Sequence, residues 1–254
     1  MKNKIVSIIL IAVLFSSCTH YYYVPNTQNV PLFMEKNEYR ASLSIGGGGE
    51  SNAIDGQVAY SVTNHIAVMT NFIHAQGGKD SGNNWAKGKL IEGAIGYYKP
   101  FKTNGVFEIY GGYGGGNQHH NYGDDNTNLG NSDLSFTRIF LQPSVGITFK
   151  GFDFALSTRV CRLNFNKIDI QSITYGNDFD EVDAIAHHKT SYLVEPAFTI
   201  RGGWKYVKLQ FQLMSSKNLT NPNLNFEPSR LSFGVYFTIA DRYRKNDSKK
   251  SVDF

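Results

Sequence analysis

Histidines and carboxylates gather in two polar stretches of the chain, where they could bind a divalent metal or carry out acid–base chemistry. These residues are His119, His120, Asp124 and Asp125 in the first stretch, and Asp178, Asp180, Glu181, Asp183, His187 and His188 in the second. Imidazoles and carboxylates are the side chains that zinc and calcium sites use. The stretches show no fixed ligand spacing, and the chain has no zinc motif, nucleophile elbow or phosphate loop. We therefore expect solvated polar loops without a metal, with a divalent-metal site or a hydrolytic site as the alternatives.

The two cysteines have different expected roles. Cys161 lies in a regular alternating stretch with no histidine near it in the sequence, so we expect a buried small apolar residue and not a nucleophile. Cys18 follows an N-terminal segment that is typical of export signals. If Cys18 carries lipid, Cys161 has no partner for an internal disulfide.

Residues 1–17 are predicted to be a signal peptide. Lys2 and Lys4 precede an apolar run of roughly eleven residues, too short for a transmembrane helix, which needs about 20. The run ends in Phe15-Ser16-Ser17-Cys18, and small residues directly before a cysteine resemble a bacterial lipoprotein signal. That resemblance implies cleavage before Cys18 and acylation of its thiol and new amino group; a plain secretory signal is the alternative. No acidic run follows Cys18, so nothing in the sequence indicates export to the cell surface.

The stretch 134–165 shows most clearly which secondary structure positions the histidines, carboxylates and Cys161. Ile139, Leu141, Val145 and Ile147 alternate with polar or small residues, and the alternation resumes after a short turn containing Gly151. A period of two is typical of β-strands, because successive side chains point to opposite faces. The stretch therefore predicts a β-hairpin with one apolar and one polar face.

The same alternation recurs along the chain and predicts ten strands in all. The strands cover residues 38–46, 53–61, 65–75, 85–98, 105–116, 134–149, 152–165, 189–200, 205–214 and 230–239. Short connections (62–64, 99–104, 150–151, 201–204) alternate with longer ones, of which 117–133, 166–188 and 215–229 are long and polar, while 47–52 is short. An even strand number with this alternation is typical of bacterial outer-membrane barrels. We predict a closed, antiparallel, up-and-down transmembrane β-barrel with both termini on the periplasmic side.

The two faces of the predicted strands differ consistently. The apolar faces carry aromatic residues at the strand ends, as membrane interfaces require: Tyr60, Tyr97, Phe107, Phe149 and Phe152 at the expected periplasmic ends, and Trp85 and Tyr113 near the opposite ends. The polar faces carry charges of both signs, including Glu92, Glu108, Arg138, Arg159, Glu195 and Lys208. Because an ionised group in a narrow lumen needs a partner or water, we expect these six residues to form a charge network that plugs the barrel. A small polar pore is the alternative.

Two prolines conflict with the strand pattern. Pro143 and Pro196 lie on apolar faces inside predicted strands, and proline cannot donate a hydrogen bond to a sheet. We expect local bulges at both; an open sheet is the competing explanation.

The segments that flank the barrel domain (38–240) show no regular period. Residues 18–37 contain Pro25 and Pro31 and an asparagine-rich centre, which predicts an extended linker from the lipid anchor to the first strand. Residues 241–254 form a basic tail, expected to be a disordered periplasmic end; contact with anionic headgroups or a partner protein is the alternative.

The linker and the hairpin after it also carry a family resemblance. Tyr22–Asn26, Asn29–Phe33, Glu35, Lys36 and Glu38, followed by the 59–69 pattern AYSVTNHIAVM, resemble a family of Bacteroidetes outer-membrane β-barrel lipoproteins. The resemblance covers about the first 75 mature residues and implies location more than activity.

Composition agrees with a membrane barrel. Aromatic residues make up 14% and charged residues 18% of the chain, whereas charge is about a quarter in soluble proteins. The net charge of +4 is too small to suggest nucleic-acid binding, and no basic helix supports it.

We therefore expect a non-enzymatic outer-membrane barrel lipoprotein without a cofactor other than the lipid on Cys18. Its expected partners are outer-membrane lipid and the membrane proteins of an envelope assembly, secretion or uptake complex. Two alternatives stay open: a hydrolase whose loop His and Asp residues resemble those of ten-stranded outer-membrane proteases, and a lipid-tethered, lipocalin-like binder with its apolar faces inside.

Overall fold

The protein is a closed β-barrel. The computed structural model describes residues 20–78, 83–123, 128–171 and 177–243, and side chains from residue 182 onward in the helix that begins at Asn177. Its elements are β1 (Tyr39–Gly47), β2 (Ser51–Ser61), β3 (Ile66–Gly78), β4 (Trp85–Phe101), β5 (Gly105–Gly123), β6 (Asn128–Thr148), β7 (Phe152–Gln171), α2 (Asn177–His187), β8 (Thr190–Gly203), β9 (Val207–Ser215), β10 (Lys217–Asn218) and β11 (Ser229–Ile239). No helix in these ranges is long and apolar enough to cross a membrane.

Antiparallel pairing between sequence neighbours closes the wall. Each strand from β1 to β9 pairs with the next, β9 pairs with β11, and β11 pairs with β1. The two-residue β10 adds to β8 beyond the end of β9. Within the described ranges, ten strands therefore form a ring, and the predicted fold is confirmed.

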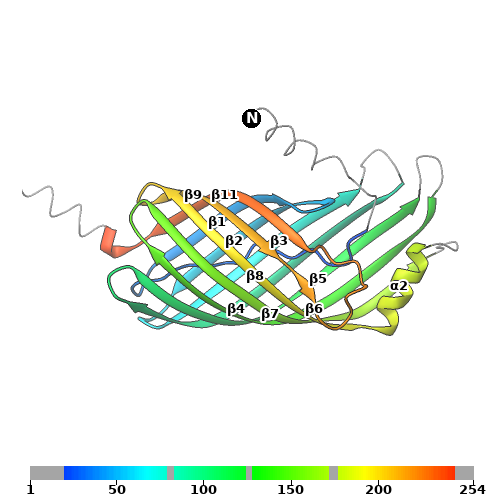
Figure 1. The fold of residues 1–254 in the computed structure, drawn as a ribbon, viewed down its shortest axis with the longest axis horizontal. Coiled ribbons are helices and arrows are strands. Elements are labelled where there is room, and N and C mark those ends of the chain that lie inside the picture. Colours follow the sequence, from blue (N-terminus) through cyan, green and yellow to red (C-terminus); the bar gives the residue numbers. More distant parts are fainter. Residues whose placement is uncertain (1–19, 79–82, 124–127, 172–176, 244–254) are drawn as a thin grey trace, which may run out of the picture.

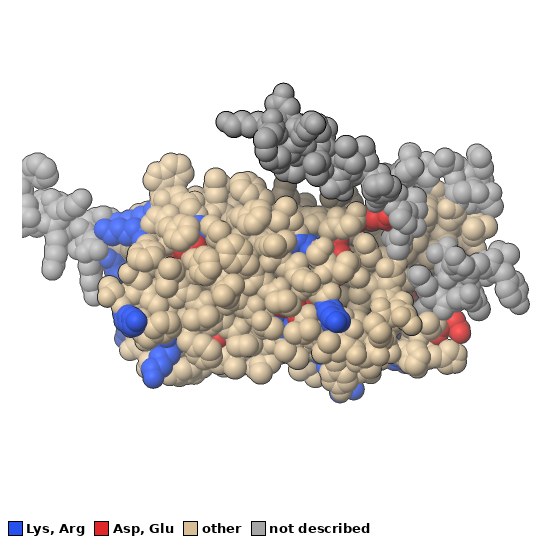
Figure 2. Space-filling view, viewed as in Figure 1, with Lys and Arg blue, Asp and Glu red and all other residues tan. Residues whose placement is uncertain are grey.

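Side chains alternate across this wall as the sequence pattern requires. On β6, Ile139 and Leu141 are 55% and 50% exposed, whereas Arg138 and Gln142 are fully buried in the lumen. Large apolar side chains cover the outside along the other strands too, and the face in Figure 2 is mostly free of charge between the two ends of the barrel. This arrangement is the opposite of a lipocalin-like binder, which would bury the apolar faces.

The two ends of the barrel differ. At one end, the turn end, connections 62–65, 102–104, 149–151 and 204–206 join the strands. At the other, the loop end, the hairpin of β5 and β6 extends and α2 follows β7 (Figure 1). Most of the predicted loop 117–133 is thus strand, and part of the predicted loop 166–188 is helix. The strand extensions were not predicted because the tip of the β5–β6 hairpin is polar on both faces and shows no alternation.

Neither proline causes a bulge. Pro196 pairs with Thr158, and the ladder between β6 and β7 skips two residues around Pro143 without a change of register, since Leu141–Val160 and Ser144–Ser157 belong to one register. Because proline has no backbone N–H to donate, pairing is interrupted around Pro143, but neither strand gains the extra residue that defines a bulge. Register shifts occur instead at Tyr122/Gly123 and at Ser135/Phe136. The expected bulges are wrong, and so is the open sheet.

The segment before β1 runs through the inside of the barrel. Residues 20–37 form neither helix nor strand, and nearly all of 20–33 are buried. Its contacts run from the loop end, where Asn225 donates to the His20 carbonyl, to the turn end, where the Asn37 amide donates to the Ser61 carbonyl. The place of this segment in the lumen was not predicted.

The described chain therefore begins and ends at opposite ends of the barrel. His20 lies at the loop end, whereas Tyr243 packs against Tyr206 at the turn end (Figure 1). This differs from the expected common side of both termini, because the segment before β1 crosses back through the lumen.

Candidate functional site

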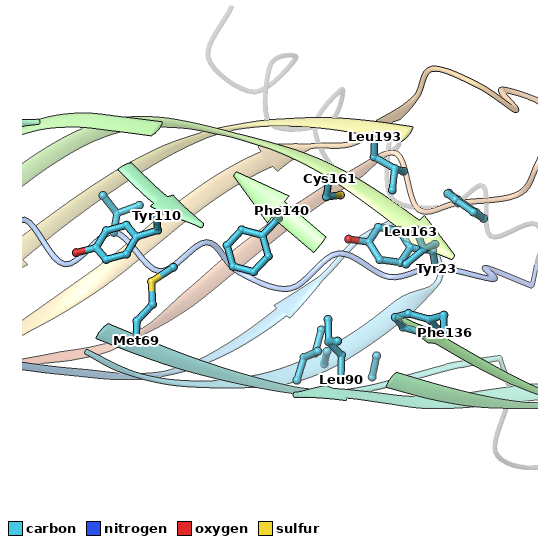
Figure 3. Packing of buried hydrophobic residues seen from close by; sticks show 14 of the residues in the cluster. Tyr23, Met69, Leu90, Tyr110, Phe136, Phe140, Cys161, Leu163 and Leu193 are labelled. Carbon is cyan, nitrogen blue, oxygen red and sulfur yellow. The ribbon is translucent and has the colours of Figure 1, made fainter. Parts of the chain in front are cut away.

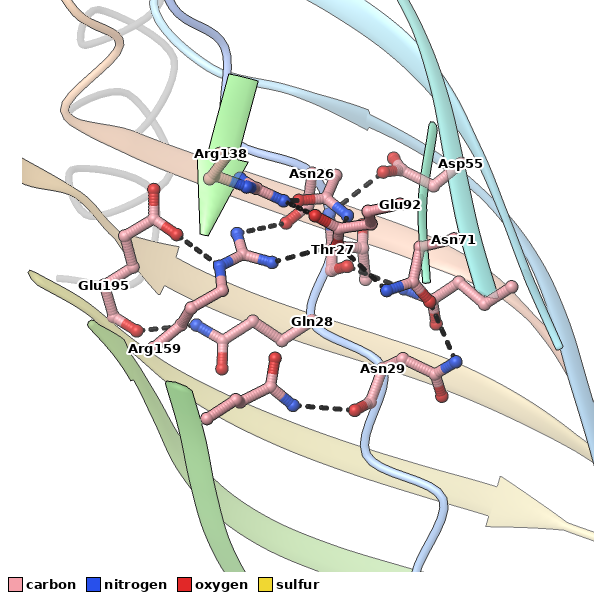
Figure 4. A network of polar contacts seen from close by, with 12 residues as sticks. Asn26, Thr27, Gln28, Asn29, Asp55, Asn71, Glu92, Arg138, Arg159 and Glu195 are labelled. Atoms are coloured by element: carbon pink, nitrogen blue, oxygen red, sulfur yellow. Dashed lines mark hydrogen bonds and ion pairs between the residues drawn. The ribbon is translucent and has the colours of Figure 1, made fainter. Parts of the chain in front are cut away.

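The centre of the lumen is a polar network that joins the wall to the threaded segment (Figure 4). Arg138 of β6 forms an ion pair with Glu92 of β4, and both side chains are fully buried. The same guanidinium donates to the hydroxyl of Tyr23 and, at 2.7 Å, to the side-chain oxygen of Asn26. The Asn26 amide in turn donates to Glu92 at 2.9 Å. One arginine thus holds a wall carboxylate and two side chains of the segment.

A second ion pair extends the network to β7 and β8. Nε of Arg159 donates to Glu195 at 2.6 Å, and Arg159 also lies 3.7 Å from Glu92. The Tyr23 hydroxyl donates to Glu195 at 2.8 Å while it accepts from Arg138. Tyr23 therefore bridges the two ion pairs, and four of the six residues predicted for the network lie together.

Directly after Asn26 along the segment, side chains of the wall bind the segment's backbone. The Thr27 amide donates to Asp55, which Arg230 pairs at 3.1 Å. Gln28 and Gln212 form a reciprocal pair: the Gln28 amide donates to the Gln212 side chain at 2.7 Å, and the Gln212 side chain donates to the Gln28 carbonyl at 2.9 Å. These bonds replace the ladder that a strand would supply, which lets an irregular backbone be buried.

Glu108 and Lys208 lie away from the centre. Glu108 accepts from the amides of Leu32 and Phe33, at 3.1 and 2.9 Å, so the segment satisfies this carboxylate with backbone donors. Lys208 binds Asp153 at 2.6 Å and the Phe149 carbonyl at 2.7 Å, near the turn end. The six predicted residues all face the lumen, but they form three separate groups.

Apolar packing fills the lumen toward the loop end. The ring of Tyr23 contacts that of Phe136 (Figure 3). Tyr23 also contacts Phe226, and Phe136 contacts Phe165. The same buried cluster includes Leu163, Leu193 and Cys161, together with Val182 and Ile185 of α2. Cys161 is buried here as a small apolar side chain.

The loop end of the lumen is lined by histidines and amides. We define the mouth as His20, Asn84, Gln118 and His120, which surround a cavity of about 40 Å³. Nδ1 of His20 lies 3.2 Å from Nδ1 of His120, and the His120 side chain is fully buried. Beside the mouth, Ser51 donates to Glu227 at 2.8 Å, and burial raises the pKa of the Glu227 carboxyl to about 7.

The residues proposed for metal or hydrolytic chemistry do not come together. His120 faces the lumen, whereas its neighbour His119 points outward and binds Asp133 at 2.8 Å. His187 and Asp183 form an exposed pair on α2. Asp124, Asp125 and the side chains of Asp178, Asp180 and Glu181 lie outside what the structure describes. Among the described residues, no group of three or more His, Cys, Asp or Glu could hold a metal ion.

The threaded segment is the functional feature that sequence reasoning missed. One signal was available: residues 20–34 contain four aromatic side chains of Tyr and Phe and no Asp, Glu, Lys or Arg. A linker in water is usually rich in charge and poor in aromatics. Composition, and not periodicity, therefore indicated burial.

Comparisons with known proteins show similarity of fold alone. No family model matches the chain, and no curated protein sequence matches it. Among solved structures, the chain is similar to the translocator domain of the autotransporter NalP from Neisseria meningitidis, with 8% identity and a TM-score of 0.43 over 94% of this chain and 95% of that one. It is also similar to the outer membrane protease OmpT from Escherichia coli (9% identity, TM-score 0.41, 84% and 99%) and to a KdgM porin (10%, 0.38, 79% and 99%).

Proposed function

We propose that this protein is a non-conducting β-barrel lipoprotein of the bacterial outer membrane that acts as a structural or accessory subunit of an envelope assembly, secretion or uptake complex. The occupied lumen is the observation that carries the proposal. Arg138, Arg159, Glu92 and Glu195 are 0–3% exposed, and the segment that covers them belongs to the same chain. A pore for solutes would leave such charges hydrated.

The outer surface supports a place in a membrane. Apolar side chains from every strand of the ring face outward, and an aromatic belt surrounds the turn end: Tyr39, Tyr97, Phe101, Phe107, Phe149, Phe152, Trp204 and Tyr206 are each at least 40% exposed. In water such a surface would drive aggregation, whereas in a bilayer it matches the acyl chains and the interface. By the rule of short periplasmic turns, the turn end faces the periplasm.

The lipid anchor and the partners belong to the same proposal. Cys18 carries the lipid, which is the one covalent group we propose, and outer-membrane lipid surrounds the barrel. The His and Asp candidates that the structure describes are dispersed, which supports a role without catalysis. We propose that the wall and the loop end contact other membrane proteins of the complex.

Conductance tests the proposal directly. The purified, folded protein in planar bilayers is expected to stay silent, whereas a variant lacking residues 20–34 should open a polar pore. Heat-modifiable migration on gels establishes that each sample is folded. Steady conductance by the native protein would contradict the proposal, even if the deletion variant fails to fold.

The role in a complex has its own test. Gentle detergent extraction of native outer membranes should recover the barrel in an assembly larger than the monomer, with membrane proteins at fixed stoichiometry. Recovery of a monodisperse monomer under conditions that preserve other envelope complexes would argue against a subunit role.

A further inference from the structure

We infer that the acylated N-terminus of this protein lies on the outer face of the membrane, because the chain threads its own N-terminal segment through the barrel to the loop end. This inference rests on the lipidation of Cys18 proposed above. The modification site is then a surface lipid anchor, held in the leaflet opposite to the one that the turns approach.

The path of the segment is the first argument. Its contacts follow one order along the barrel: the Tyr23 carbonyl accepts from the Glu227 amide near the loop end, Asn26 meets Glu92 at the centre, and the Val30 carbonyl accepts from Arg201. The Asn37 amide then reaches Ser61 at the turn end. The segment crosses the lumen once and does not double back.

Chain length is the second argument. Cys18 precedes His20 by two residues, so its Cα lies within about 7 Å of that of His20 even when the chain is fully extended. The hydrocarbon core of a bilayer is about 30 Å thick. A lipid on Cys18 therefore reaches the leaflet at the loop end and cannot reach the other leaflet while residues 20–37 occupy the lumen.

The number of hydrogen bonds between the segment and the wall is the third argument. The carbonyl of Pro31, for example, accepts two of them, from Arg40 at 3.1 Å and from Tyr236 at 2.7 Å. Withdrawal of the segment would remove hydrogen-bond partners from the buried side chains of the wall, namely Glu92, Arg138, Asp55 and Glu108. Residues 20–34 carry no Asp, Glu, Lys or Arg of their own. The segment is thus a fixed part of the fold and not a strand that slips out to return the lipid to the periplasmic leaflet.

The geometry removes the need for a surface-export signal next to Cys18. The sequence after the cysteine, Thr19-His20-Tyr21, holds no acidic run. Here the barrel itself provides the route across the membrane, and insertion of the barrel places the anchor outside.

Protease accessibility in cells tests the inference. A site for a specific protease is inserted between Thr19 and His20 in the full-length chain, and the matched control carries the same site between Lys36 and Asn37, two exposed residues at the turn end. Cells are grown with an alkyne fatty acid, and protease is added to intact or permeabilised cells. We expect the 19/20 site to be cut in intact cells, with loss of acyl label from the barrel polypeptide, and the 36/37 site to be cut only after permeabilisation.

An independent readout fixes the orientation and keeps each outcome decisive. An impermeant thiol reagent should label Tyr21→Cys and His187→Cys in intact cells, and Lys102→Cys only after permeabilisation. If His187→Cys is labelled from outside but position 21 and the 19/20 site are reached only after permeabilisation, the threading inference is overturned while the barrel proposal stands. Absence of acyl label from the uncut protein overturns the lipoprotein proposal, and the inference with it.

Discussion

Removal of the buried Arg138 should destabilise the barrel more than removal of Arg162, an arginine exposed on the outside of β7. The guanidinium forms an ion pair with Glu92 and donates to Tyr23 and Asn26, all inside the lumen. Arg138→Gln leaves Glu92 buried with a weaker set of partners, namely Arg159 at 3.7 Å and the amides of Asn26 and Asn71, each at 2.9 Å.

The size of the effect follows from those remaining partners. Loss of one member of a buried ion pair costs about 3–5 kcal/mol, because the other charge stays uncompensated. Since Glu92 keeps two amide donors, we expect the low end of this range, about 3 kcal/mol, for Arg138→Gln. Glu92→Gln should cost a similar amount, because it leaves the arginine unpaired. The double variant should lose no more than about 2 kcal/mol, since neither charge remains.

Equilibrium unfolding in urea, with the protein in lipid vesicles or detergent micelles, measures these changes. Fluorescence of Trp85 and Trp204 follows the transition, and linear extrapolation gives the free energy of unfolding in water. The matched control is Arg162→Gln, because Arg162 is exposed on the outside of β7 and should change stability by less than about 1 kcal/mol. If the Arg138 variant behaves like the Arg162 variant, or if the two single losses simply add in the double variant, the reasoning about the network is refuted.

Three further predictions concern the lipid, the wall and Glu227 beside the mouth. Cys18→Ser should abolish acyl labelling but leave an integral membrane protein that resists carbonate washing. Recovery of this variant as folded protein in a detergent-free periplasmic extract would contradict the assignment as a membrane barrel. Phe211→Arg on the outer face should cost about 2–4 kcal/mol of unfolding free energy in vesicles, and a loss below 1 kcal/mol would mean that this face does not meet lipid. Because burial raises the pKa of Glu227 from 4.5 to about 7, its stabilising contribution is fully present below pH 4.5 and is lost as pH rises through about 7. Amide exchange at Glu227, whose N–H binds the Tyr23 carbonyl, should therefore be slower at pH 5 than at pH 8 after correction for intrinsic rates, and Glu227→Gln should flatten this difference; an equal profile in both proteins would contradict it.

The wall of the barrel could be predicted because each residue carries local information about its face. Arg138 and Ile139 are neighbours in sequence, and the period of two alone assigns one to the lumen and the other to the outside. The turns at 102–104 and 149–151 then follow from the points where alternation stops. Strand ends at the loop end were less predictable, because β5 beyond Gly116 is polar on both faces.

The contents of the lumen could not be predicted from periodicity. Residues 20–33 are bound through side chains of many different strands, from Asp55 on β2 to Tyr236 on β11, so their conformation depends on long-range contacts and not on a local repeat. The polar faces showed that Glu92 and Arg138 point inward but not that Asn26 and Tyr23 lie between the ion pairs. The placement of α2 has the same origin, since Val182 and Ile185 are buried in one cluster with Leu163 and Leu193 of the wall.

A photo-crosslink from the segment to the wall tests the occupied lumen most directly. A photoreactive residue at Gln28 replaces a side chain that donates to the Glu195 carbonyl at 2.6 Å and contacts Met214, while its amide binds Gln212. Irradiation of the folded protein in native membranes should join residue 28 to peptides of β8 or β9 within the same chain, as read by mass spectrometry. Cross-links from position 28 to lipid or to other envelope proteins, with none to β8 or β9, would show that the segment lies outside the barrel and would contradict the account.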